Sequence, residues 1–177
     1  MSDRIELTKK ERLFLINQYR ILALLDREGE ADYYQKCIRI LESGYEFHYY
    51  ILDQFIDAPM STEETREILD ILSMFRVLND SYKRLEDKSG IEEWQIKFLG
   101  FDGNNEAGEM GYIAFLAKHD DRFTDVIERD KYNSHCPCLD RYRKMLEHFR
   151  RNFPNSQILT KEQMLEVTTA GLNREHA

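Results

Sequence analysis

The sequence predicts an all-α fold, an irregular bundle of about six to seven helices with no substantial sheet. Helix breakers are scarce, because the 177 residues include only three Pro and eight Gly. Three capping boxes, each a Ser or Thr followed three residues later by Glu or Gln, mark helix starts. Apolar residues then recur at helical spacing after each of these starts.

The capping boxes fix the predicted order of the helices. The three pairs are Thr8 with Glu11, Ser61 with Glu64, and Thr160 with Gln163. Together with the apolar periodicity they predict helices over about residues 9–25, 30–43, 62–87, 105–118, 139–151 and 161–169, and an aromatic, apolar segment over 46–56. Gly44 is a natural stop for the second of these, because glycine accepts the left-handed conformation that ends many helices.

The helix expected over 9–25 is apolar around most of its circumference. Its apolar residues are Leu13, Phe14, Leu15, Ile16, Tyr19, Ile21, Leu22, Leu24 and Leu25. A helix that is apolar nearly all round is either central in its domain or covered by a second subunit. We therefore expect a homo-oligomer, a dimer or larger, with Leu13–Leu25 and Tyr45–Ile56 at the interface.

The helix expected over 62–87 carries the most regular apolar stripe. Ile71, Phe75, Leu78, Tyr82 and Leu85 follow steps of four, three, four and three residues. This heptad-like seam is too short for a free-standing coiled coil. We expect it to pack along another helix of the same chain.

The stretch 91–105 between two predicted helices is irregular. Trp94, Ile96 and Phe98 alternate with polar residues, which is the pattern of a short strand. A lone strand has no partner with which to pair, so an extended connection is the favoured interpretation.

The length and the net charge of the chain limit its domain organisation and the partners that it can bind. We expect residues 1–177 to form a single domain, with a core over about 6–152 and a C-terminal helix over about 161–169. The formal net charge of −8 makes nucleic acid an unexpected partner. No apolar run approaches the roughly 20 residues that span a bilayer, and Met1–Lys10 has no signal-peptide pattern. Three cysteines indicate reduced thiols and a cytoplasmic location.

Several short motifs resemble those of the bacterial YfbU family. They are Asn17-Gln18-Tyr19-Arg20-Ile21-Leu22, Gly44-Tyr45, Phe98-Leu99-Gly100-Phe101-Asp102, and Gly111-Tyr112 followed by Phe115. The resemblance covers roughly residues 6–152 and implies a helical, soluble protein, with no catalytic residues to carry over. Some members of this family are joined to DNA-binding modules, which implies a ligand-sensing or regulatory role by analogy. The Cys136-Pro137-Cys138 pair and the C-terminal segment depart from the family pattern.

Two groups of residues are candidates for binding a small ligand. Asp102, Asn104, Asn105 and Glu106 offer polar groups just before a predicted helix start, where free backbone N–H groups favour anions. The alternative is that Asp102 or Asn104 caps that helix while Phe98, Leu99 and Phe101 fill the core. The second group, Tyr45, His48 and Tyr49, belongs to an aromatic cluster that suits an interface or a ligand pocket.

Metal sites form weaker alternatives. His48, His119, Asp120 and Asp140 follow the order of ligands in metal-dependent phosphohydrolases of the HD type, without the surrounding motifs. His135, Cys136 and Cys138 carry zinc-ligand or redox-active groups, but a structural zinc needs a second ligand pair. An ordinary reduced loop is the favoured interpretation of these thiols.

The sequence therefore favours a non-enzymatic interaction or ligand-sensing module that self-associates, with a further protein partner or a small ligand as its target. No cofactor, metal, membrane or catalytic residue is expected. A metal-dependent hydrolase of the HD type is the alternative.

Overall fold

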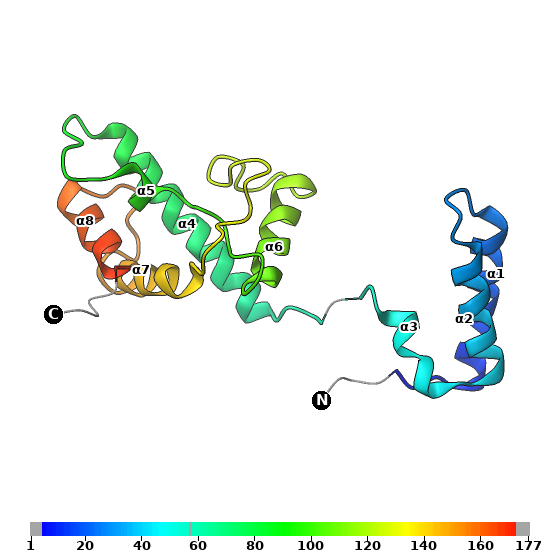
Figure 1. Cartoon of the computed structure of the whole chain (residues 1–177). Coiled ribbons are helices and arrows are strands. Elements are labelled where there is room, and N and C mark those ends of the chain that lie inside the picture. Colours follow the sequence, from blue (N-terminus) through cyan, green and yellow to red (C-terminus); the bar gives the residue numbers. More distant parts are fainter. Residues whose placement is uncertain (1–4, 57, 173–177) are drawn as a thin grey trace. The chain divides into compact units, whose positions relative to one another are not determined.

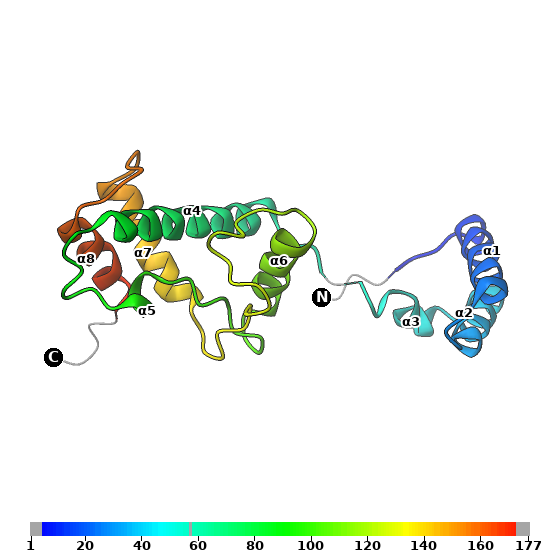
Figure 2. The same cartoon turned by 90° about the horizontal axis from the view of Figure 1, so that it is seen from above.

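The computed structural model describes residues 5–56 and 58–172, which fall into two compact units, Met1–Pro59 and Met60–Ala177 (Figures 1 and 2). Each unit is described by itself below. The single domain expected from the sequence stays a prediction.

The first unit is a helical hairpin. Helices α1 (Lys9–Leu25) and α2 (Ala31–Ser43) lie side by side and are followed by the short η1 (Glu46–His48) and α3 (Tyr50–Asp53) (Figure 1). The predicted capping box at Thr8 begins α1, and Gly44 ends α2 in the left-handed conformation. The Arg12 guanidinium donates a hydrogen bond of 2.9 Å to the Leu41 carbonyl, which ties α1 to the end of α2.

The core of the first unit is small. One cluster comprises Cys37, Ile40, Tyr49 and Ile51, and a second comprises Ile16, Ile38 and Leu41. Most of these side chains come from α2, and α1 contributes Ile16 as its buried residue. A hairpin of this size therefore leaves much of its apolar surface outside its own core.

The second unit is built around α4 (Thr62–Arg84), which runs the length of the unit in both views (Figures 1 and 2). It packs against α5 (Glu93–Ile96), α6 (Ala107–Lys118), α7 (Leu139–Asn152) and α8 (Lys161–Ala170). The predicted seam is confirmed, because Ile71, Phe75 and Leu78 are fully buried and the two later members, Tyr82 and Leu85, are half-buried.

Four aromatic rings meet at the centre of the second unit. Phe75, Phe98, Phe101 and Tyr142 lie with ring centroids 4.9 to 5.8 Å apart. The Tyr142 hydroxyl accepts a hydrogen bond from the Leu99 N–H at 3.1 Å and donates to the Gly100 carbonyl at 3.3 Å. The Phe98–Asp102 motif thus fills the core with its two phenylalanines, whereas Leu99 is half-buried and the residue that precedes α6 is Glu106 instead of Asp102 or Asn104.

The all-α class is confirmed, since the described residues contain no strand and one isolated bridge, between Phe101 and Asn133. Two local predictions were wrong. Residues 93–96 form α5 instead of an extended connection, and Glu92 and Gln95 make a capping box at its start that lacks the Ser or Thr of the usual motif. The helix expected to reach about residue 87 ends at Arg84.

Candidate functional site

The outer face of α1, the face turned away from α2, is exposed and largely apolar, with Asn17 and Gln18 as its polar residues. Phe14, Ile21 and Leu25 lie within about 40° of one another on the helix, opposite Ile16. The large apolar side chains of α1 that remain exposed, to between 43% and 86%, are Leu13, Phe14, Ile21, Leu22, Leu24 and Leu25. Helix α1 is therefore not at the centre of its own unit, which was one of the two explanations for a helix that is apolar nearly all round.

This outer face of α1 is also nearly free of charge. Between Phe14 and Leu25 the one charged residue is Arg20. Its guanidinium forms an ion pair with Glu42 of α2 at 2.7 Å. No uncompensated charge therefore interrupts the exposed apolar stripe between these two residues.

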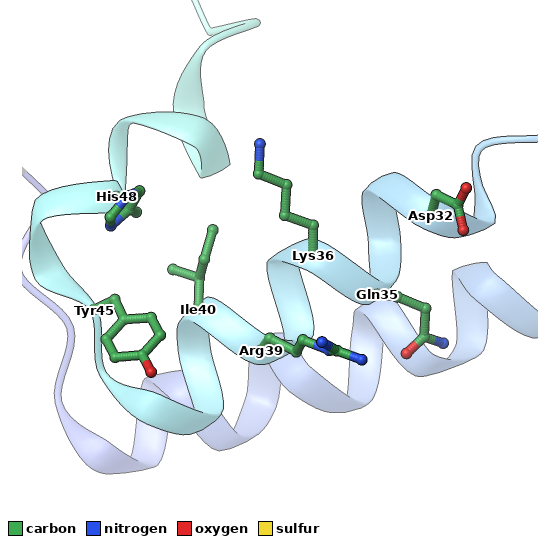
Figure 3. A pocket seen from close by; sticks show the side chains of 7 residues that line it. All are labelled: Asp32, Gln35, Lys36, Arg39, Ile40, Tyr45 and His48. Carbon is green, nitrogen blue, oxygen red and sulfur yellow. The ribbon is translucent and has the colours of Figure 1, made fainter.

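A groove runs along α2 toward the η1 turn and has a volume of about 550 Å³ (Figure 3). It is lined by Asp32, Gln35, Lys36, Arg39, Ile40, Tyr45 and His48. Tyr45 and His48 lie at one end, Asp32 and Gln35 lie at the other, and Lys36, Arg39 and Ile40 lie between them (Figure 3). Ile40 is 5% exposed and forms the apolar floor.

The structure separates the three aromatic candidates of this unit. Tyr45 and His48 line the groove, whereas Tyr49 is 3% exposed and packs in the core beside Cys37. Sequence reasoning missed the four polar residues of α2. The available signal was their spacing of i, i+3, i+4 and i+7, which places them on one helix face: Asp32, Gln35, Lys36 and Arg39.

The acidic candidates of the second unit form an internal network. The Glu106 carboxylate is buried and accepts hydrogen bonds from the backbone N–H groups of Asp102, Cys138 and Leu139, at 2.9, 2.8 and 2.7 Å. The buried Asp102 carboxylate accepts from the Asn104 N–H at 3.2 Å and from the Asn105 side chain. Both carboxylates therefore already bind groups of the chain itself, and ligand binding here stays a prediction.

The residues that were candidates for a metal site make separate contacts elsewhere in the structure. His48 belongs to the first unit, and in the second the His119 ring lies 6.0 Å from the Phe115 ring. Asp120 pairs with Arg122 at 3.6 Å, and Asp140 pairs with Arg143 at 3.7 Å. Within the described part of the chain, no three His, Cys, Asp or Glu side chains gather as a metal site requires. No observation here supports the HD-type hydrolase.

The two thiols of the Cys136–Cys138 pair differ in their surroundings. Cys136 is exposed, whereas Cys138 is buried at the start of α7. Burial raises the pKa of the Cys138 thiol, so less of it is present as the reactive thiolate at neutral pH. Any chemistry of this pair with a reagent in solution therefore begins at Cys136.

No helix in residues 5–56 or 58–172 combines the length and the apolar character needed to cross a membrane. The YfbU domain matches residues 5–170, a range that covers most of each unit. UPF0304 protein MJECS11 of Methanocaldococcus jannaschii is 36% identical over 170 residues, which cover 93% of this chain and 99% of that protein. The chain therefore belongs to the YfbU family.

Proposed function

We propose that the protein is a non-enzymatic interaction module that self-associates through the outer face of α1. The single observation that carries this proposal is that α1 leaves six large apolar side chains exposed, of which Phe14, Ile21 and Leu25 lie opposite the buried Ile16. Monomeric proteins rarely expose a contiguous apolar patch of this kind unless it is an interaction site.

A second copy of the same chain is the partner that fits this face best. The Phe14–Leu25 stretch offers apolar groups and no uncompensated charge, so it is complementary to itself. Two helical hairpins that pair through such faces produce a four-helix bundle, a common and stable arrangement. A two-fold axis through the middle of α1 would place the same patch on both sides of the contact.

The charges at the two ends of the hairpin favour an antiparallel pairing of the α1 helices. The loop after α1 carries Asp26, Arg27, Glu28 and Glu30, a net charge of −2, whereas α1 begins with Lys9, Lys10, Glu11 and Arg12, a net charge of +2. None of the described residues forms an ion pair with Lys9, Lys10 or Glu28. The 17 residues of α1 separate these ends by about 25 Å, well beyond the screening length of about 8 Å at physiological salt. An antiparallel pair brings opposite charges together, and a parallel pair brings like charges together.

Charge reversal at the two ends tests both the contact and its direction. We expect Glu28→Lys to weaken self-association by about tenfold, and Lys9→Glu/Lys10→Glu to do the same. Combining the three substitutions in one chain should restore the affinity to within about threefold of the wild type. If Glu28→Lys strengthens the association instead, the pairing is parallel. If the wild type does not associate, the proposed function is wrong.

A regulatory role and a cytoplasmic location complete the proposal. The regulatory role rests on the analogy with family members that are joined to DNA-binding modules, and the location rests on the three cysteines without a disulfide framework.

A further inference from the structure

The groove along α2 has a volume and an apolar base that are typical of a small-molecule site. Its volume of about 550 Å³ lies within the range of about 300–1,000 Å³ that is typical of small-molecule sites. The buried Ile40 side chain supplies an apolar floor, and polar side chains surround it (Figure 3). Such a combination fixes a ligand by shape and a few polar contacts.

The groove contains two cationic side chains, those of Lys36 and Arg39. Lys36 and Arg39 are three residues apart on α2 and therefore share one face. Neither forms an ion pair with any residue in 5–56 or 58–172, whereas Arg20 of the same unit pairs with Glu42. Two cations that have no ion-pair partner among the described residues, beside an apolar base, are complementary to the anionic group of a ligand.

The η1 end of the groove is aromatic. The His48 ring lies at the centre of a cluster, with ring centroids 6.3 Å from Tyr45, 5.4 Å from Phe47 and 6.4 Å from Tyr50. Flat rings of this kind favour contact with a planar apolar group. At the far end lie the Asp32 carboxylate and the Gln35 amide (Figure 3), whose oxygens are able to accept hydrogen bonds from N–H or O–H donors of a ligand.

We propose that this groove binds a small organic anion, a carboxylate or a phosphate monoester that carries a planar apolar group. Lys36 and Arg39 bind the anionic group, and Ile40, Tyr45 and His48 contact the planar part. The site is made by α2 and the η1 turn, and none of its lining residues belongs to α1. Ligand binding is thus a separate property from the proposed pairing of α1 faces.

Titration of the full chain with phenyl phosphate and, separately, with benzoate tests this site, with backbone amide chemical shifts as the readout. We expect saturable binding of at least one of these probes, with the largest shifts in α2 and η1. Benzyl alcohol, which keeps the ring and lacks the charge, should bind at least about tenfold more weakly. The tighter of the two anions identifies whether the groove prefers a carboxylate or a phosphate.

The double variant Lys36→Gln/Arg39→Gln should weaken binding of the anion at least about tenfold. The control variant Arg66→Gln/Arg129→Gln removes the same charge at two exposed arginines of the second unit, outside the groove, and should bind within about twofold of the wild type. The inference is overturned if neither anion binds saturably up to about 10 mM, or if Lys36→Gln/Arg39→Gln binds like the wild type. A monomeric protein that binds the probe would refute the proposed self-association and leave this inference standing.

Discussion

The carboxylate of Glu106 accepts a hydrogen bond of 2.7 Å from the backbone N–H of Leu139. Glu106 is the residue directly before α6, and Leu139 is the first residue of α7. The same carboxylate oxygen accepts a second bond from the Cys138 N–H at 2.8 Å. The first turn of α7 is therefore capped by a residue that lies 33 positions earlier in the chain. A negative group at this place also interacts favourably with the positive end of the helix dipole.

We expect Glu106→Ala to lower the free energy of unfolding of the second unit by about 3 kcal/mol, because buried backbone donors lose their acceptor. Urea denaturation measures this change. Glu86→Ala is the matched control at an exposed glutamate and should change stability by no more than about 0.5 kcal/mol. Equal tolerance of the two substitutions would show that the network around Glu106 does not stabilise the fold.

A pair of glycine substitutions should have opposite effects. Gly100 has a φ of +90°, and a Cβ atom there would lie 2.2 Å from the Tyr132 carbonyl oxygen. Gly100→Ala should therefore cost about 3 kcal/mol or more of stability. Gly111 lies within α6, and a Cβ atom added there would meet no atom outside its own helix turn within 4 Å, so Gly111→Ala should stabilise the helix by about 0.5–1 kcal/mol. Thermal unfolding of both variants checks the sign, and a stabilised Gly100→Ala would contradict the close approach of Gly100 to Tyr132.

The decrease in the free energy of unfolding at acid pH should depend in part on Glu128. Hydrogen bonds from the side chains of Lys131 and Lys97 lower the pKa of the Glu128 carboxyl from 4.5 to about 2. A carboxyl whose pKa is lower in the folded state stabilises the fold above its unfolded pKa, and this contribution is lost as the pH falls from about 4.5 toward 2. Glu128→Gln should therefore lose less stability than the wild type over that range. An NMR titration in which Glu128 shows an ordinary pKa would contradict this expectation.

The three thiols should react at different rates in the native protein. Cys136 is exposed, whereas Cys37 and Cys138 are buried. Iodoacetamide at neutral pH should modify Cys136 first, and the other two should react when urea unfolds the chain. Peptide mass mapping after a short reaction identifies the modified residue. Rapid modification of Cys138 in the native state would show that the start of α7 is open to solvent.

Local signals in the sequence predicted the helices well. All three capping boxes form as expected at Thr8, Ser61 and Thr160, and the apolar stripe of α4 is the buried seam. These features depend on residues within one or two turns of each other, so a single sequence contains them. The all-round apolar pattern of α1 likewise anticipated a face that its own unit leaves exposed.

Contacts between distant segments escaped prediction. Nothing in the local pattern around Glu106 indicates that it caps α7, because its partners at Cys138 and Leu139 are brought to it by the fold. The groove was found only in part for the same reason. Tyr45 and His48 are recognisable as aromatic residues in the sequence, but the place of Lys36 and Arg39 in the groove depends on the position of the η1 turn beside α2.

Sedimentation equilibrium of the wild type and of Ile21→Asp tests the central claim, self-association through the outer face of α1, most directly. Ile21 is 53% exposed and points away from α2, so the substitution spares the hairpin core and places a charge within the proposed contact. Ile158→Asp makes the same change at an isoleucine of the second unit that is 41% exposed. We predict a dimer or larger assembly for the wild type and Ile158→Asp at about 10 μM, and at least about tenfold weaker association for Ile21→Asp. A monomeric wild type, or an Ile21→Asp variant that associates as strongly as the wild type, would contradict the account.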